Sequence, residues 1–103
     1  GAAPQFVGRW KKPSTVDNHR TDEVYGYAFQ CGGRGVLIIW APNEDGDPAT
    51  WSAKIPASVQ VFNIAGGSLQ EKQIELGESP VYLVSEELLA QDMGKQVQLQ
   101  LSP

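Results

Sequence analysis

The chain has 103 residues, of which 41% are hydrophobic and 19% charged, and its formal net charge is −4. This size and composition are typical of one globular domain, and the acidic balance disfavours nucleic acids and anionic membrane surfaces as partners. The single cysteine, Cys31, excludes an internal disulfide and a zinc site built from several cysteines. No apolar run reaches the roughly 18 residues of a membrane-spanning helix, so we expect no membrane partner.

Hydrophobic and polar residues alternate with a period of two along most of the chain, as they do in half-buried strands. Breaks rich in glycine, proline and aspartate separate the alternating stretches. The pattern predicts strands, in chain order, at residues 6–12, 23–31, 36–41, 51–55, 58–64, 69–76, 81–84 and 95–101.

The second predicted strand places Tyr25, Tyr27, Phe29 and Cys31 on one face. We expect this aromatic side of the strand to be buried, with Cys31 as a structural thiol, because free cysteine is among the most buried residue types. A run of glycines then makes a hairpin turn.

The third predicted strand, residues 36–41, is apolar on both faces and ends in Trp40. Such a strand is typical of the middle of a sheet that is covered on both sides, so we expect Trp40 to lie in the core.

One helix is predicted, at residues 85–93, with Ser85 as its cap and Gly94 just after its end. The last predicted strand follows it and would turn Val97, Leu99 and Leu101 inward.

About seven or eight short strands with regular turn signals predict an all-β fold, an antiparallel β-sandwich formed by one domain over residues 1–103. The chain begins with Gly-Ala-Ala-Pro. Without an initiator Met, this start is typical of a cleaved tag or of an excised fragment, and we expect a domain excised from a larger protein.

Three segments carry a resemblance to a known family. They are Gly35-Val-Leu-Ile-Ile-Trp40, Val59-Gln-Val-Phe-Asn-Ile-Ala-Gly-Gly67 and Leu76-Gly-Glu-Ser-Pro-Val-Tyr-Leu-Val84. In this order they resemble the small C-terminal β-sandwich that follows the TIM-type catalytic barrel in many glycoside hydrolases. The resemblance covers roughly residues 23–84 and concerns the pattern of strands.

The resemblance implies a non-catalytic accessory domain that packs on or supports a catalytic barrel of the same parent chain and also contacts polysaccharide. It implies that the catalytic acids lie in the barrel, that Tyr82 is structural, and that the parent protein is extracellular or at the cell surface. No catalytic residue maps onto this chain.

Residues outside the resemblance agree that the domain itself is no enzyme. The only histidine, His19, lies in a polar loop without a rigid partner, and the chain has no nucleophile motif.

Two candidate sites for ligands stand out. Trp51 and Trp10 are candidate platforms for carbohydrate, because an exposed indole covers the apolar face of a sugar; the alternative is that both pack in the core. Asn43, Asp45 and Asp47 offer oxygen ligands for Ca²⁺ in one loop, but we favour a polar hairpin tip there, because such loops are common, and we expect no cofactor.

Two other functions stay open beside the accessory domain. An independent carbohydrate-binding module would show exposed tryptophan rings. An immunoglobulin-like surface interaction domain would show a contiguous apolar patch of a few hundred Å².

Overall fold

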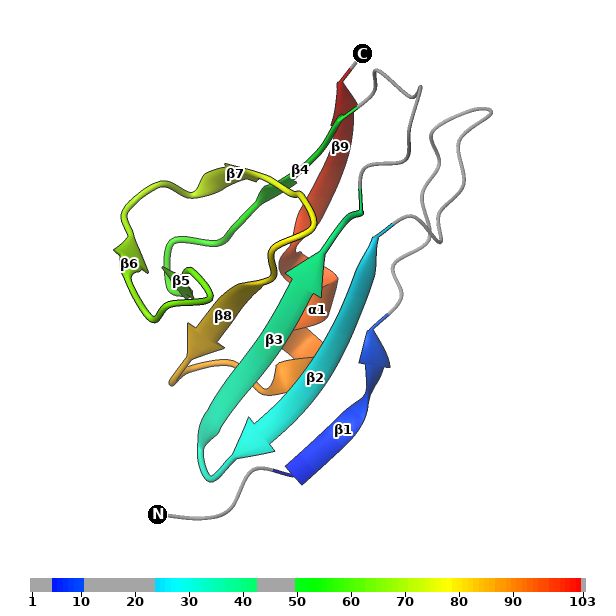
Figure 1. The fold of residues 1–103 in the computed structure, drawn as a ribbon. Helices are drawn as coiled ribbons and strands as arrows, with labels where there is room; N and C mark the ends of the chain where they lie inside the picture. Colours follow the sequence, from blue (N-terminus) through cyan, green and yellow to red (C-terminus); the bar gives the residue numbers. More distant parts are fainter. Residues whose placement is uncertain (1–4, 11–23, 43–49, 103) are drawn as a thin grey trace.

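The protein is described by a computed structural model that covers residues 5–10, 24–42 and 50–102. The fold is all-β, with two antiparallel sheets and one short helix, as predicted (Figure 1). The elements are β1 (Gln5–Trp10), β2 (Tyr25–Cys31), β3 (Arg34–Trp40), β4 (Thr50–Lys54), β5 (Gln60–Phe62), β6 (Ser68–Leu69), β7 (Gln73–Glu75), β8 (Val81–Ser85), α1 (Ala90–Gln96) and β9 (Gln98–Ser102).

The larger sheet has the strand order β1-β2-β3-β8-β5-β6, and the smaller sheet has the order β7-β4-β9. The predicted strand 69–76 is in fact two short strands, β6 and β7, which belong to different sheets. The β2–β3 hairpin turns at Gly32, where φ is 64°, a conformation that glycine adopts without steric cost and that type II′ hairpin turns require.

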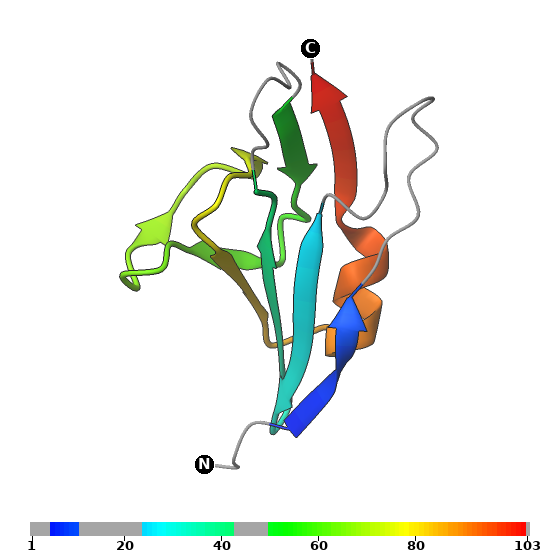
Figure 2. The ribbon, with the colours of Figure 1, turned by 45° about the vertical axis from the view of Figure 1, so that its right-hand side comes forward.

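The helix α1 covers one face of the larger sheet, next to β1, β2 and β3 (Figure 2). Gly35 allows this close approach, because a Cβ there would lie 2.7 Å from the Leu88 carbonyl oxygen and 2.8 Å from the Ala90 nitrogen. On β2 the same inner face carries Gly26 and Ala28, which are both buried. Small side chains therefore line the floor on which the helix rests.

The core lies between this inner face, the helix and the smaller sheet. Its fully buried side chains come from both sheets, from the helix and from the segments beside them. The largest are Leu37, Ile39, Val59, Val61, Leu83, Met93 and Val97.

The helix differs from its predicted bounds, since it spans residues 90–96 and not 85–93. Ser85 is the buried end of β8, and its Oγ accepts hydrogen bonds from the backbone N–H groups of Glu87 and Leu88 at 3.2 and 3.0 Å. Ser85 therefore closes a turn ahead of the helix. Gly94 lies inside the helix, where it is buried, and the last strand consequently starts at Gln98.

The first backbone N–H group of the helix, that of Ala90, is bonded by a side chain of β2. The Gln30 side-chain oxygen accepts a hydrogen bond from the Ala90 N–H at 3.1 Å, across a separation of 60 residues. This acceptor replaces a local cap at Leu89, which makes no side-chain capping bond. A long-range cap of this kind leaves no signal in the local sequence pattern.

The expected orientation of β2 is wrong. Tyr25, Phe29 and Cys31 are half-buried and Tyr27 is exposed, because the opposite side of the strand faces the helix. Trp40 is likewise only half-buried, on the same outer side, so the third predicted strand is not covered on both faces by the described residues.

Candidate functional site

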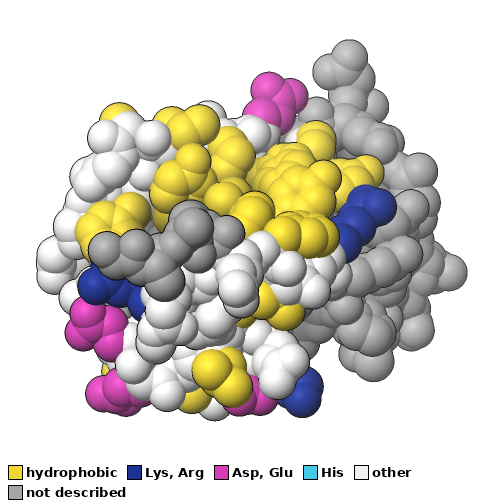
Figure 3. Space-filling model, turned by 90° about the horizontal axis from the view of Figure 1, so that it is seen from below, with side chains coloured by type: hydrophobic (Ala, Val, Ile, Leu, Met, Phe, Trp, Pro, Cys, Tyr) yellow, Lys and Arg dark blue, Asp and Glu magenta, His cyan; other side chains and the backbone are white. Residues whose placement is uncertain are grey.

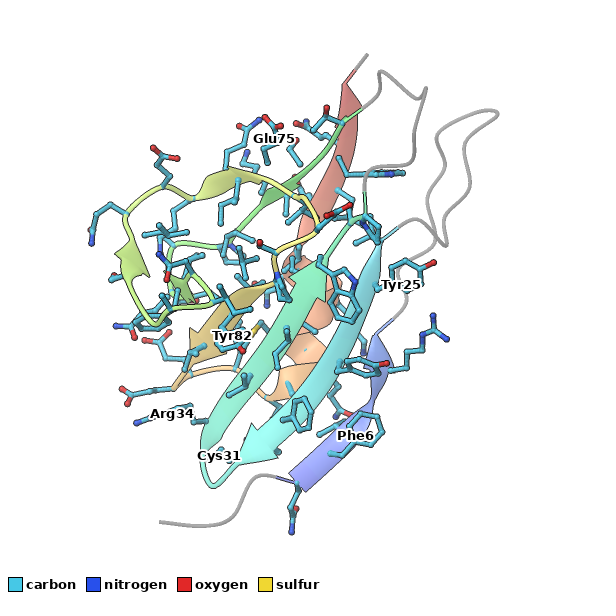
Figure 4. All side chains as sticks on the ribbon, in the orientation of Figure 1. Phe6, Tyr25, Cys31, Arg34, Glu75 and Tyr82 are labelled. Carbon is cyan, nitrogen blue, oxygen red and sulfur yellow. The ribbon has the colours of Figure 1, made fainter. Side chains whose placement is uncertain are left out.

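The outer face of the larger sheet, opposite α1, carries a contiguous set of aromatic and aliphatic side chains. Figure 3 shows hydrophobic side chains gathered in one continuous area, and Figure 4 shows Phe6, Tyr25 and Tyr82 on strands of this sheet. We call this set the aromatic face. It consists of Phe6, Tyr25, Tyr27, Phe29, Val36, Ile38, Trp40, Tyr82 and Val84.

Strand register brings these residues together. Residues that pair across neighbouring strands point to the same side of a sheet, with their Cβ atoms about 5 Å apart. Two rows cross β1, β2, β3 and β8 in this way. The first row is Phe6, Phe29, Val36 and Val84, and the second is Arg9, Tyr27, Ile38 and Tyr82.

Phe6 of β1 packs against two aromatic side chains of the neighbouring strand β2. Its ring lies 5.5 Å from that of Phe29 at an interplanar angle of 63°, and 6.1 Å from that of Tyr27 at 56°. Such tilted and edge-to-face pairs are favourable for aromatic quadrupoles. Phe6 nevertheless leaves 60% of its surface exposed and Tyr27 leaves 42%, so this corner is the most accessible part of the face.

A second cluster forms around Tyr25. Its ring stacks on Trp40 with centroids 5.7 Å apart and planes 22° apart, and the Arg9 guanidinium carbon lies 5.5 Å from its centroid. Arg9 comes from β1 and Trp40 from β3, the strands that flank β2. Tyr25 thus has contacts with both neighbouring strands, one of them a stacked ring and the other a cation over its ring.

Trp40 also contacts Tyr27, at a centroid distance of 5.6 Å and an angle of 39°. The rings of this face are thus packed against one another, and Arg9 is the charged residue that the two rows place among them. Such a surface offers apolar contact area with defined shape.

The structure places the predicted site residues differently. Trp51 lies on β4 with only 4% of its surface exposed, so the expectation of an exposed sugar platform on this ring is wrong. Trp51 belongs to the hydrophobic core, which the sequence analysis had kept as the alternative.

The remaining candidates lie outside the described part of the chain. This holds for the side chain of Trp10, for His19, and for the candidate calcium ligands Asn43, Asp45 and Asp47. Within residues 5–10, 24–42 and 50–102, no group of three or more His, Cys, Asp or Glu side chains lies close enough to hold a metal ion.

Sequence reasoning recognised that Tyr25, Tyr27 and Phe29 share a face but missed that this face is the outer one. The signal was on the alternate positions, where Gly26 and Ala28 of β2 and Gly35 of β3 carry little or no side chain. A glycine inside a strand often marks a place where another backbone approaches closely.

No protein-family model, no curated protein and no solved structure matches the chain. None of the helices that the structure describes has the length and hydrophobicity to cross a membrane.

Proposed function

We propose that this protein is a non-catalytic accessory module that docks through its aromatic face onto a neighbouring protein domain. The observation that carries the proposal is the orientation of the larger sheet. Its aromatic residues face away from the core, and no described element covers them.

The size of the face supports docking within one polypeptide. Four strands about 4.8 Å apart, each contributing roughly 15 Å of length, give an area of about 300 Å². This is the size at which exposed apolar patches on monomers are often functional, yet it is well below the roughly 800 Å² that each partner of a stable complex buries. A small interface suffices when a linker supplies a high effective concentration, so a neighbouring domain of the same chain is the occupant that fits best.

The ring geometry favours a protein over a sugar. A pyranose packs flat on an exposed aromatic face, whereas the Tyr25 ring stacks on Trp40 and carries the Arg9 guanidinium over it, and Trp51 is buried. An independent carbohydrate-binding module is therefore the weaker candidate. An immunoglobulin-like interaction domain remains the alternative if the docked protein is a separate chain.

The nature of the neighbouring domain rests on the strand pattern of residues 23–84. On the resemblance to the glycoside hydrolase module, the neighbour is a TIM-type catalytic barrel, and the parent protein works outside the cell or at its surface. The hydrolytic activity would then belong to the barrel, and this module would support the barrel and add to its contact with polysaccharide.

The first test is the mass of the natural polypeptide that contains this sequence, measured by mass spectrometry on protein from its source. The proposal expects a polypeptide far larger than the 11.2 kDa of this chain, with a glycoside hydrolase activity. A natural polypeptide of 11.2 kDa alone would exclude tethered docking.

The second test is Tyr27→Ser, made both in this chain and in the natural polypeptide. Loss of the docked ring should lower the melting temperature of the neighbouring domain by several degrees, beyond the small effect in the isolated chain. Ile64→Ser is the matched control, because Ile64 is exposed to 58% and lies outside the aromatic face. Equal effects of the two variants would contradict the proposal.

Affinity electrophoresis through gels with plant, algal and host polysaccharides distinguishes the proposed docking module from a carbohydrate-binding module. The proposal expects unretarded migration in every gel. Retardation by one glycan that is lost in Tyr27→Ser would instead assign the aromatic face to carbohydrate.

A further inference from the structure

The two sheets end in four edge strands, which are β1 and β6 in the larger sheet and β7 and β9 in the smaller one. An edge strand presents unpaired N–H and C=O groups and is a template for pairing with another chain. Natural proteins therefore protect their edges with bulges, charges, prolines or short strands.

Three of these edges carry such protection. The register of β1 against β2 shifts between Phe6 and Gly8, so one residue bulges out of the ladder. The strands β6 and β7 have two and three residues, which is too short for extended pairing.

The strand β9 carries none of it. Its sequence, Gln98-Leu-Gln-Leu-Ser102, contains no charge, proline or glycine, and it pairs with β4 in unbroken register over all five residues. Within the described part of the chain, no strand pairs with its other edge. Because main-chain groups alternate in direction along an antiparallel strand, half of those in β9 point away from β4.

The β9 sequence is also complementary to itself. In an antiparallel pair centred on Gln100, Gln100 lies opposite its own copy, and Leu99 lies opposite the partner's Leu101. Residues 98 and 100 are exposed in this chain, whereas residue 99 is half-buried against the core. The pairing therefore keeps polar positions beside polar ones and apolar positions beside apolar ones, and it opposes no like charges.

We propose that β9 pairs with β9 of a second copy of this chain, in antiparallel orientation about a two-fold axis. The pairing joins the two smaller sheets into one continuous sheet and leaves the aromatic face free. It does not depend on the proposed accessory function, because the two surfaces belong to different sheets.

The dimer is expected to be weak. Strand addition over five residues is a small interface, and small interfaces of this kind belong to weak, transient complexes. We expect a dissociation constant between about 10 µM and 1 mM, the range of such contacts.

Sedimentation velocity of the 103-residue chain from about 10 µM to 1 mM, a span set by the expected affinity, tests the proposal. Gln100→Lys places two like charges about 5 Å apart at the two-fold axis and should weaken the dimer by at least about tenfold. Gln91→Lys adds the same charge at an exposed position on α1 and should leave dimerisation unchanged.

A monomer throughout this concentration range would overturn the proposal. So would a dimer that Gln100→Lys does not weaken, or one that is lost in Tyr27→Ser, since that result would place self-association at the aromatic face. Near-UV circular dichroism checks that Gln100→Lys is folded, and Gln100→Glu, which also places two like charges at the two-fold axis, provides a second variant of the same test.

Discussion

The two faces of the larger sheet differ in the size of their side chains. A sheet usually turns its largest apolar residues toward the core, whereas here the large aromatic residues of β2 and β3 lie on the outer face. The inner face uses glycine and alanine where the helix rests, and the outer face carries three of the largest side chains of β2 and β3, Tyr25, Tyr27 and Trp40. The helix imposes this division, because its backbone approaches β3 too closely for any side chain at position 35. The large residues are thereby left on the outside, where they are available for a partner.

Truncation at adjacent positions of β3 should separate the two faces most clearly. Leu37 is fully buried on the inner face, and we expect Leu37→Ala to lower the free energy of unfolding by about 3 kcal/mol through the cavity it leaves. Ile38 is the next residue along β3 and is half-buried on the outer face, so Ile38→Ala should lower the free energy of unfolding by only about 1 kcal/mol. Urea unfolding measures both, and equal losses would mean that the outer face is as covered as the inner one.

Filling the floor under the helix is the next test. Gly35→Ala places a methyl group against the Leu88 and Ala90 backbone and should destabilise the fold by about 2 kcal/mol, because backbone atoms cannot yield locally. Gly33→Ala is the matched control two residues away, where a Cβ meets nothing within 4 Å. The melting temperatures of both variants, measured by thermal unfolding, test this prediction. A melting temperature of Gly35→Ala equal to that of Gly33→Ala would show that the helix does not require a glycine beneath it.

Removal of the Arg9 charge probes the outer face alone. We expect Arg9→Gln to lower the free energy of unfolding by about 0.5–1 kcal/mol, the usual strength of an exposed cation–π contact. Tyr25→Leu in the same background should abolish this effect, so a double-mutant cycle measures the coupling. A coupling energy near zero would remove Arg9 from the cluster.

The smallest effect is expected at the end of the sheet away from both faces. Arg34 and Glu86 form an ion pair of 3.1 Å with both side chains largely exposed. Glu86→Gln should change the free energy of unfolding by less than about 0.5 kcal/mol, because water and salt screen such pairs. A larger loss that vanishes in 1 M salt, roughly a 3 Å Debye length, would show that this pair stabilises the hairpin more than expected.

The fold class and most strands could be predicted, because period-two alternation depends only on local sequence. The local pattern could not show which face of a strand is turned toward the core. The alternation in β2 showed that Tyr25 and Tyr27 share a face, but the choice of the outer face depends on a helix that lies more than 50 residues further along the chain. The start of that helix likewise depends on Gln30, whose hydrogen bond to Ala90 spans 60 residues.

The candidate site was missed for a related reason. Sequence reasoning searched for exposed tryptophan in Trp51, which follows an acidic loop, and assigned Trp40 to the core because its strand is apolar on both sides. The structure places Trp51 in the core, in agreement with the packing interpretation of that residue, and the prediction that Trp40 is buried is wrong, since Trp40 lies half-buried on the outer face. Apolar residues on both sides of a strand are equally consistent with a buried strand and with one that offers a docking surface.

Hydroxyl-radical footprinting tests the central claim most directly, because it reports the accessibility of individual side chains. The oxidation rates of Phe6 and Tyr27 would be compared between this chain and the larger polypeptide that the proposal expects to contain it, with Ile64 and Leu89, exposed hydrophobics outside the aromatic face, as internal references. Docking predicts that Phe6 and Tyr27 are oxidised readily in this chain and protected in the natural polypeptide, while the two references do not change. Equal oxidation of all four residues in both proteins would contradict the account.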